Sequence, residues 1–236
     1  MKRRVPHFNK IKVEWGTNSR FCAPFAVKKT KMGHNRHFSP ILICRHDKGI
    51  IKKNYGGQPM SSITIQKTSI TGLQVDAIVN AANSRLMNGG GVCGAIFQAA
   101  GAYELQAACN KIGKCNTGNA VITPGFKLPA KYVIHAVGPI WNGGAYNEAQ
   151  LLYSAYKQSL KVAKENGIHS IAFPLISAGI YGYPKDEAWR KALQSCKDFI
   201  DANKDYEIDI VFAVIDDAIL ALGKKTMTDL NIADKM

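Results

Sequence analysis

The sequence lacks any long hydrophobic run. No apolar stretch approaches the roughly 18 residues of a membrane-spanning helix. The basic start MKRR resembles the beginning of a secretory signal, but VPHFNKIKVEW follows where an apolar stretch is required. Glycine and proline, with 21 and 9 residues, show no period that would indicate a collagen-like or low-complexity chain. Because 46% of the 236 residues are hydrophobic, we expect a globular cytoplasmic protein without membrane contact.

Paired cysteines are also missing, since none of the six forms a CxxC motif. A chain of this length builds a core without disulfides, so we interpret them as reduced thiols. We interpret three of them as structural because no histidine is near in sequence, and these are Cys109, Cys115 and Cys196. A zinc site in the first quarter would use Cys22, His34, His37, Cys44 and His46. Their spacing matches no usual zinc finger or knuckle, so the sequence disfavours a zinc site in this quarter.

Acidic residues are scarce, with 17 Asp and Glu against 31 Lys and Arg, which gives a net charge of +14. Residues 1–60 hold 14 of the basic and 2 of the acidic residues, so +12 lies there and +2 in the remainder. This quarter shows no sustained hydrophobic period. We predict a basic, largely irregular extension over residues 1–59 and one domain over 60–236. Nucleic-acid binding through the extension is one interpretation. A solvated extension, or upstream sequence joined to a domain that starts at Met60, is favoured over it.

From Ser61 onward, short β-branched runs alternate with longer amphipathic stretches. The runs are SITI, DAIVNAA, NAVIT, KYVIHAV, HSIAFPLI and EIDIVFAVI, and the amphipathic stretches lie near 94–112, 147–166, 185–203 and 216–230. This alternation predicts an α/β fold with a largely parallel sheet that is covered on both faces. In such sheets ligands bind beyond the carboxyl ends of the strands.

Two glycine-rich loops follow predicted strands and precede predicted helices. The first contains Gly89, Gly90 and Gly91, and the second is SAGIYGYP over residues 177–184. Glycines let backbone amides approach a ligand, and a helix amino terminus attracts anions. The pair indicates a diphosphate held between the loops, with Tyr181 and Tyr183 offering flat surfaces to a sugar or base. Two tight structural turns are the alternative. Neither GK[ST] nor GxGxxG with an acidic ribose anchor is present, which disfavours a kinase, an ATPase or an ordinary dehydrogenase.

Several motifs together resemble the macrodomain family, in particular its ADP-ribosyl hydrolase branch of O-acetyl-ADP-ribose deacetylase-like proteins. They are VDAIVNAAN, GGGVCGAIFQAAG, TGNAVIT, LPAKYVIHAVGP, NEAQLLYSAY and IAFPLISAGIYGYP, and they span about residues 61–230. The resemblance implies a three-layer α/β/α sandwich around a mixed sheet of six or seven strands. It also implies that ADP-ribose lies across the edge of this sheet, with no metal and no separate cofactor.

The resemblance assigns roles to individual positions. Asn83 matches the residue that hydrogen-bonds the distal ribose and positions the attacking water, and Cys93 stands at the second candidate catalytic position. The candidate ligand-binding residues are Ser69, Ile70, Asn80, Gly89, Gly90, Gly91, Val92, Ser177, Ala178, Gly179, Ile180, Tyr181, Gly182 and Ile215.

Three positions depart from the family pattern. Cys93 stands where many hydrolases of this branch have Asp, and a thiol near a helix amino terminus is expected to have a lowered pKa. Ser69 replaces the aspartate that accepts from the adenine amino group, and Ile215 replaces an aromatic that stacks on adenine. The expectation is weakened adenine recognition and intact recognition of the distal ribose.

Other polar residues have simpler interpretations. His135 lies in an apolar strand and is expected to be a core histidine. Asp186, Glu187, Asp216 and Asp217 are expected at helix starts, where acidic side chains favour the helix dipole.

The sequence thus predicts a monomeric hydrolase of ADP-ribose esters, acting on ADP-ribosylated Asp or Glu of proteins or on O-acetyl-ADP-ribose. A non-catalytic ADP-ribose-binding module, which Cys93 favours, and a nucleic-acid-binding protein are the alternatives.

Overall fold

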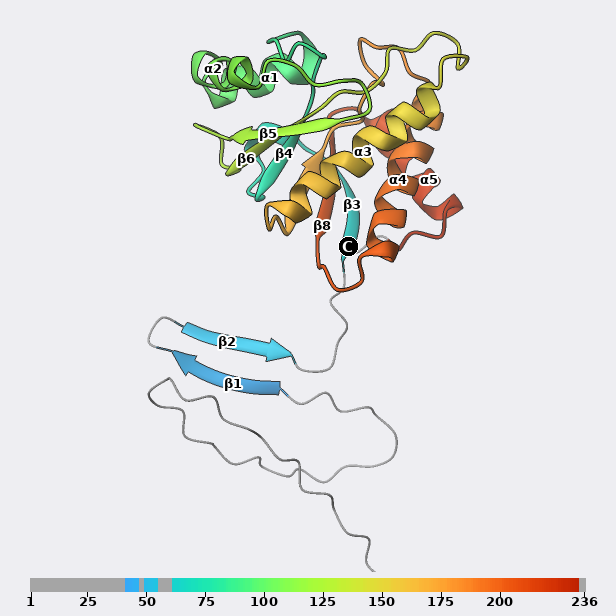
Figure 1. The fold of residues 1–236 in the computed structure, drawn as a ribbon. Helices are drawn as coiled ribbons and strands as arrows, with labels where there is room; N and C mark the ends of the chain where they lie inside the picture. Colours follow the sequence, from blue (N-terminus) through green and yellow to red (C-terminus); the bar gives the residue numbers. More distant parts are fainter. Residues whose placement is uncertain (1–40, 47–48, 55–60, 234–236) are drawn as a thin grey trace, which may run out of the picture. The chain divides into compact units, whose positions relative to one another are not determined.

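A computed structural model describes residues 41–46, 49–54 and 61–233. The chain divides into two compact units, residues 1–57 and 58–236. In the first unit, strands β1 (Ile41–His46) and β2 (Gly49–Asn54) form an antiparallel hairpin (Figure 1). This hairpin lies in the region for which the sequence predicted a largely irregular extension. Of the residues considered for zinc, Cys22, His34 and His37 lie outside the described residues.

The second unit is built on a six-stranded mixed sheet with the order β3-β8-β7-β4-β6-β5. The first five strands in this order run parallel, and β5 pairs antiparallel with β6 at the edge. The strands are β3 (Ser62–Lys67), β4 (Ala77–Ala81), β5 (Ala120–Pro124), β6 (Tyr132–Ala136), β7 (Ser170–Phe173) and β8 (Asp209–Val214). The predicted mixed sheet of six or seven strands is confirmed.

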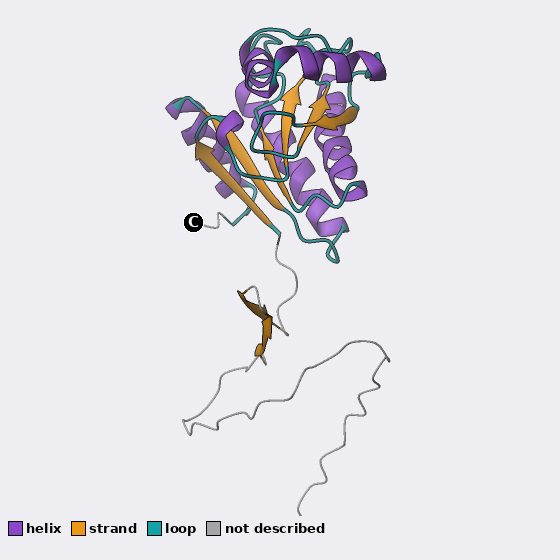
Figure 2. Cartoon of the chain, turned by 90° about the vertical axis from the view of Figure 1, so that its left-hand side faces the viewer, coloured by secondary structure: helices purple, strands orange, loops and turns teal. Residues whose placement is uncertain are grey.

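Helices cover both faces of this sheet and complete three layers (Figures 1 and 2). One face carries α1 (Gly91–Ala100), α2 (Ala102–Ile112) and the short 3-10 helix η1 (Ile70–Gly72). The other face carries α3 (Glu148–Glu165), α4 (Lys185–Ala202) and α5 (Asp217–Asp229). None of the described helices is both long and apolar enough to cross a bilayer.

Strand β4 shows how the two cores divide the sheet. Ala77 and Val79 pack into the core beneath α3 and α4, whereas Ile78 packs into the core beneath α1 and α2. Both sets are fully buried because successive side chains of a strand point to opposite faces. Asn80 therefore faces α1, on the same side as Ile78, and this places a polar amide inside the α1–α2 core.

The helix starts agree with the sequence analysis. Asp216 is the N-cap of α5, and its carboxylate accepts a hydrogen bond of 3.0 Å from the backbone N–H of Ile219. Asp217 lies in the first turn of α5, and Asp186 and Glu187 lie in the first turn of α4. These carboxylates stabilise the positive ends of α4 and α5.

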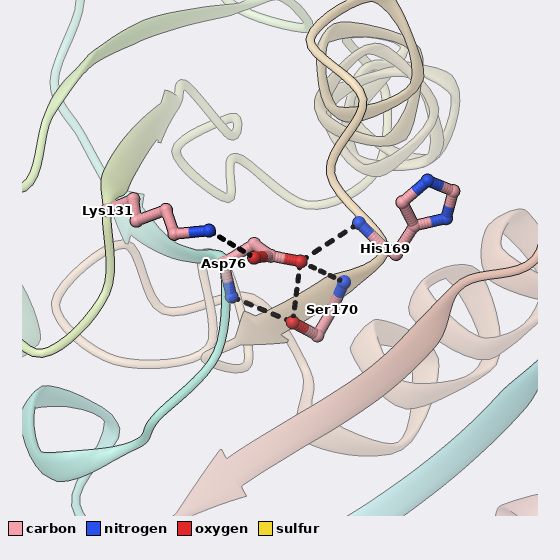
Figure 3. Close-up of polar contacts among 4 residues, drawn as sticks. All are labelled: Asp76, Lys131, His169 and Ser170. Atoms are coloured by element: carbon pink, nitrogen blue, oxygen red, sulfur yellow. Dashed lines mark hydrogen bonds and ion pairs between the residues drawn. The ribbon is translucent and has the colours of Figure 1, made fainter. Parts of the chain in front are cut away.

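A single carboxylate joins three strands at the amino edge of the sheet (Figure 3). Asp76 precedes β4, and its Oδ2 accepts hydrogen bonds from the backbone N–H groups of His169 and Ser170, both at 3.1 Å. The Ser170 hydroxyl donates to the same oxygen at 2.9 Å, and Lys131 Nζ lies 3.3 Å from Oδ1. Partial burial raises the pKa of Asp76, but these hydrogen bonds and Lys131 together lower it below its ordinary value.

Candidate functional site

A cavity of about 760 Å³ lies at the opposite, carboxyl edge of the sheet. Its walls come from the segments that follow β3, β4, β7 and β8, with Gly138 contributed from beyond β6. It brings together every predicted site residue except Asn80 and Gly182. The sequence analysis missed other lining residues, among them Thr68, Thr71, Gly138, Pro174, Leu175, Ile176 and Ile219. Gly138 directly follows a predicted strand, and this position was the available signal for it, whereas Pro174, Leu175 and Ile176 lay within a predicted strand.

The lining of this cavity carries no formal charge. Among the described residues that line it, there is no Asp, Glu, His, Lys or Arg. The lining therefore offers an anion backbone N–H groups and a helix dipole, but no ion pair.

The amino terminus of α1 carries no acidic or capping side chain. Its N-cap is Gly90, which provides no side-chain hydrogen bond to the first turn. Of the five α-helices in the described part of the chain, α1 alone has no acidic residue in its first turn. Unpaired N–H groups and the positive end of the dipole thus remain available at the cavity wall.

Glycines allow the first loop to fold closely against α1. Gly91 has a φ of +61°, a conformation that other residues rarely adopt. A Cβ at Gly94 would lie 2.6 Å from the carbonyl oxygen of Gly89, so a larger residue there would displace the loop. Gly94 belongs to the GGGVCG segment, but the sequence analysis assigned it no role.

Asn83 shapes the first loop as well as lining the cavity. Its Nδ2 donates to the carbonyl oxygen of Met87 at 2.7 Å. Its Oδ1 accepts from the backbone N–H groups of Arg85 and Met87 at 3.2 and 3.1 Å. The amide thus holds the turn that leads from β4 towards the glycines.

Gln106 of α2 supports the same loop from behind. Its Nε2 donates to the carbonyl oxygen of Leu86 at 3.2 Å, and its Oε1 accepts from the backbone N–H of Asn88 at 2.9 Å. The first loop is therefore positioned by amide side chains on both sides. Sequence spacing alone offered no signal for Gln106.

The second loop contains a strained, unsatisfied serine. Ser177 has a φ of +66°, which is unusual for a residue with a side chain. Its buried hydroxyl has no hydrogen-bond partner among the described residues. A Cβ on Gly138 would lie 2.2 Å from Ser177 Oγ, so only glycine leaves room for this serine. A buried donor that lines a cavity without a partner is available to a ligand.

Tyr156 of α3 anchors the start of the second loop from inside the core. Its hydroxyl donates to the carbonyl oxygen of Pro174 at 3.3 Å and accepts from the backbone N–H of Ile176 at 2.8 Å. Both bonds are buried. They fix the loop where it leaves β7, so the cavity wall is preformed.

The two glycine loops approach one another across the cavity. A Cβ on Gly90 would lie 3.2 Å from Ile180 Cδ1, although Ile180 itself is largely exposed. Gly182 lies outside the lining and serves the backbone of its own loop. It has a φ of +67°, and its N–H donates to the carbonyl oxygen of Gly179 at 2.9 Å. The candidate binding role of Gly182 thus becomes a turn-forming one.

Asn80 also lies outside the cavity lining, in a buried polar cluster beneath it. Its Nδ2 lies 3.1 Å from His135 Nδ1 and 3.6 Å from Cys93 Sγ. His135 Nε2 lies 2.9 Å from Thr123 Oγ1 and 3.7 Å from Cys109 Sγ. His135 is confirmed as a core histidine, and burial lowers its pKa to about 4. Cys109 of α2 thus contacts a histidine of β6 that is distant in the sequence, and the sequence analysis had no signal for this contact.

The expected lowering of the Cys93 pKa was wrong. The thiol lies in the first turn of α1 but is buried, and burial raises its pKa above the ordinary 9.0. Hydrogen bonds at Asn80 and at the backbone of Gly89 lower the pKa by less than burial raises it. Desolvation thus outweighs these hydrogen bonds, and Cys93 is a neutral thiol at neutral pH.

The end of the cavity formed by β3 and β8 contains the other two departures. Ser69 is exposed, and its hydroxyl lies 2.9 Å from Thr71 Oγ1. Ile215 is 81% exposed. Ser69 and Ile215 therefore offer neither a carboxylate nor an aromatic ring to the cavity.

No three His, Cys, Asp or Glu side chains gather into a metal site anywhere in the described part of the chain. The cysteines with described side chains, Cys93, Cys109, Cys115 and Cys196, are free and buried. This agrees with the prediction of reduced thiols at these positions.

Comparisons with known proteins place this geometry in a family. The Macro domain family model matches residues 79–192. An O-acetyl-ADP-ribose deacetylase of Escherichia fergusonii is 55% identical over 144 residues, which are 59% of this chain and 81% of that protein. A macro domain-containing protein of Ralstonia nicotianae is 47% identical over 173 residues, which are 72% of this chain and 98% of that protein.

Solved structures show the same fold. The Oceanobacillus iheyensis macrodomain with ADP has a TM-score of 0.67 and 31% identity, covering 83% of this chain and 98% of that one. The Trypanosoma brucei macrodomain in complex with ADP-ribose has a TM-score of 0.65 and 37% identity, covering 69% of this chain and 68% of that one. The glycine loops, the layered fold and these similarities agree, and the chain belongs to the macrodomain family.

Proposed function

We propose that this protein hydrolyses ADP-ribose esters, either ADP-ribosylated Asp or Glu on proteins or O-acetyl-ADP-ribose. The observation that carries the proposal is the uncharged cavity between two glycine loops, with the free amino terminus of α1 in its wall. Such a site neutralises a diphosphate with N–H groups. Relatives named O-acetyl-ADP-ribose deacetylase support the same chemistry.

The arrangement of the cavity suggests how the ligand lies. The diphosphate sits at the α1 terminus between the loops, and the adenosine extends towards Ser69 and Ile215. The distal ribose then lies near Asn83 and Tyr181, which line the cavity on the side of β4 and β7. The buried hydroxyl of Ser177 offers an additional hydrogen bond to the ligand.

The attacking water has few groups available to activate it. The described lining contains no carboxylate and no histidine, and the Cys93 thiol is neutral. We infer that Asn83 orients the water and that a phosphate oxygen of the substrate takes its proton. The ester bond between the distal ribose and the acyl group breaks, and the products are ADP-ribose and a carboxylic acid.

A binding module without turnover is the second candidate, and the neutral Cys93 favours it. A third role, nucleic-acid binding through residues 1–59, remains a prediction from the +12 charge of residues 1–60. The monomeric state and the cytoplasmic location belong to the proposal in the same way.

Incubation of the full chain with mono-ADP-ribosylated protein, followed by measurement of free ADP-ribose, tests the proposal. We expect turnover, and we expect Cys93→Ala to keep the rate within a few-fold, because a neutral buried thiol does not act as a base. A thiolate that took part would make the wild-type rate rise with pH towards a pKa above 9.0.

Cys93→Asp is the matched variant, since it places a carboxylate at the same backbone position. An inactive wild type whose Cys93→Asp variant hydrolyses the ester would contradict the proposal and leave a binding module. Calorimetry with ADP-ribose on each variant shows whether the site still binds.

A further inference from the structure

A second cavity of about 300 Å³ adjoins the first, and the two share Gly138 and Tyr181. Its other lining residues are Ser84, Thr117, Val137, Pro139, Ile140, Asn142, Tyr146, Glu148 and Leu151. None of these residues was a candidate site residue in the sequence analysis. The shared wall makes the second cavity a continuation of the site.

The order of the strands indicates which end of the ligand faces this cavity. The first cavity extends over β3, β8, β7 and β4, whereas the second is lined by segments next to β6 and β5. With adenosine at the β3 and β8 end, the ester-bearing ribose lies at the Asn83 and Tyr181 end. Ser84, which follows Asn83, lines the second cavity. The group esterified to ADP-ribose therefore points towards it.

Glu148 organises the outer wall of the second cavity. Its buried carboxylate accepts backbone hydrogen bonds from Tyr146 at 2.6 Å, Asn142 at 3.1 Å and Gly144 at 3.3 Å. Burial raises the pKa of Glu148, but these N–H groups lower it below its ordinary value. The ionised carboxylate is thus occupied by the loop and holds it in shape.

The remaining lining is neutral and suits a peptide. Among the described residues that line the cavity, Glu148 alone carries a charge at neutral pH. The hydroxyls of Ser84 and Thr117 and the amide of Asn142 offer donors and acceptors of the kind that backbone amides use. An anionic small molecule would find no positive charge there.

The rim presents apolar side chains to solvent. Tyr146 is 72% exposed and Ile140 is 58% exposed, and both line the cavity. The backbone N–H of Trp141 donates to the carbonyl oxygen of Tyr181 at 2.9 Å, so this rim is tied to the shared wall. An exposed aromatic and an exposed isoleucine that line one cavity are typical of a surface that contacts a macromolecule.

We propose that the second cavity binds the peptide segment next to the ADP-ribosylated side chain, so that the substrate is an ADP-ribosylated protein rather than a small ester. The inference rests on the proposed orientation of ADP-ribose in the first cavity. An acetyl group has too few atoms to occupy a cavity of about 300 Å³ or to reach its apolar rim. A peptide fills it and contacts Tyr146 and Ile140.

The test compares the affinity of the full chain for ADP-ribose with that for a stable, non-hydrolysable ADP-ribosyl peptide, by calorimetry. We expect the peptide conjugate to bind about tenfold tighter than ADP-ribose. In the double variant Ile140→Ala with Tyr146→Ala this advantage should disappear while ADP-ribose affinity stays unchanged. Both residues are exposed, so their truncation leaves the core intact.

Tyr103→Ala is the matched control, because Tyr103 is 85% exposed on α2 and lines neither cavity. It should keep the full advantage of the conjugate. Equal affinities for conjugate and ADP-ribose in the wild type, or an advantage that survives the double variant, would overturn the inference.

Turnover of O-acetyl-ADP-ribose and of an ADP-ribosylated peptide ester separates this inference from the proposed function. Loss of kcat/KM in the double variant should affect the peptide ester only, and an equal loss on both substrates would refute a peptide subsite. A wild type that hydrolyses neither substrate refutes the proposed hydrolysis, whereas the calorimetric comparison still decides the peptide subsite.

Discussion

The two edges of the central sheet use polar groups in opposite ways. At the amino edge, Asp76 is bonded to Ser170, to the backbone of His169 and to Lys131 (Figure 3). At the carboxyl edge, the cavity lining carries no charge, and the hydroxyl of Ser177 has no partner among the described residues. The first edge satisfies its polar groups within the protein. The second leaves donors for a ligand.

This difference implies that the amino edge contributes mainly to stability and the carboxyl edge mainly to ligand binding. Side-chain bonds that tie several strands together stabilise the fold, and their loss exposes buried polar groups. Unpaired donors and positive φ values cost stability but prepare a site for its ligand. Changes at the amino edge should therefore alter unfolding, whereas changes at the carboxyl edge should alter binding and turnover.

The largest effect is expected at Asn83 on the carboxyl edge. Asn83→Ala should lower turnover by a factor on the order of 10²–10⁴, because it removes a group that orients the water. The measurement is release of free ADP-ribose from mono-ADP-ribosylated protein. Asn83→Asp is the control for loop shape, because it keeps the oxygen that accepts from Arg85 and Met87. Full activity in Asn83→Ala would show that Asn83 only shapes the loop.

The next effect is expected at Asp76 on the amino edge. Asp76→Ala should lower the free energy of unfolding by about 1.5–3 kcal/mol, the order for hydrogen bonds to a charged group. Denaturant unfolding measures it, and ADP-ribose affinity of the folded variant should be unchanged. A loss of ADP-ribose affinity in Asp76→Ala without a loss of stability would contradict the assignment of stability to the amino edge and of binding to the carboxyl edge.

The same carboxylate makes stability depend on pH. The folded-state pKa of Asp76 is lowered, so its stabilisation is complete above the ordinary pKa of 3.8 and is lost as pH falls through the folded value. The difference in unfolding free energy between wild type and Asp76→Ala should therefore shrink below about pH 4. A constant difference down to pH 2 would show that the carboxylate charge contributes nothing.

Gly138→Ala tests whether the position of Ser177 requires a glycine at residue 138. A Cβ there would lie 2.2 Å from Ser177 Oγ and 2.6 Å from Ile176 Cγ2, so Gly138→Ala must displace the second loop. We expect a destabilisation of about 1–3 kcal/mol, as for overpacked cores, and weaker ADP-ribose binding in calorimetry. Gly72→Ala is the control, since no described atom lies within 4 Å of the added Cβ. Equal stability and equal ADP-ribose affinity in the two variants would mean that the second loop accommodates the added Cβ without a loss of free energy.

The smallest effect is expected at Ser69, at the end of the cavity proposed for adenine. Ser69→Asp should tighten ADP-ribose binding by roughly 1–2 kcal/mol, the order for a charged hydrogen-bond acceptor. Calorimetry with ADP-ribose and with ribose 5-phosphate, which lacks adenine, separates this effect from a general change. Unchanged affinity would show that adenine is held by other groups or is not the base recognised.

Sequence patterns alone predicted a sheet covered on both faces, with two glycine loops at one edge, and the resemblance to the macrodomain family added most of the individual cavity residues. The alternation of β-branched runs with amphipathic stretches has only a few solutions, and parallel strands place the loops after them at one edge. The glycine loops and the helix starts at Asp186 and Asp216 follow from such local rules, whereas the role of Asn83 came from the resemblance. The loops and the helix starts each depend on residues that are neighbours in the chain.

Only the tertiary structure decided the properties that depend on burial and on distant partners. The Cys93 pKa is raised because α1 packs its thiol into the core, and no local pattern reports how far water is excluded. Asn80 lies outside the cavity, although it was a predicted site residue, because β4 directs its side chain towards His135. Cys109 of α2 contacts the same histidine of β6. The second cavity likewise exists only where segments near β4, β5, β6 and β7 converge. Local rules thus determined which elements form, and long-range packing decided the environment of each side chain.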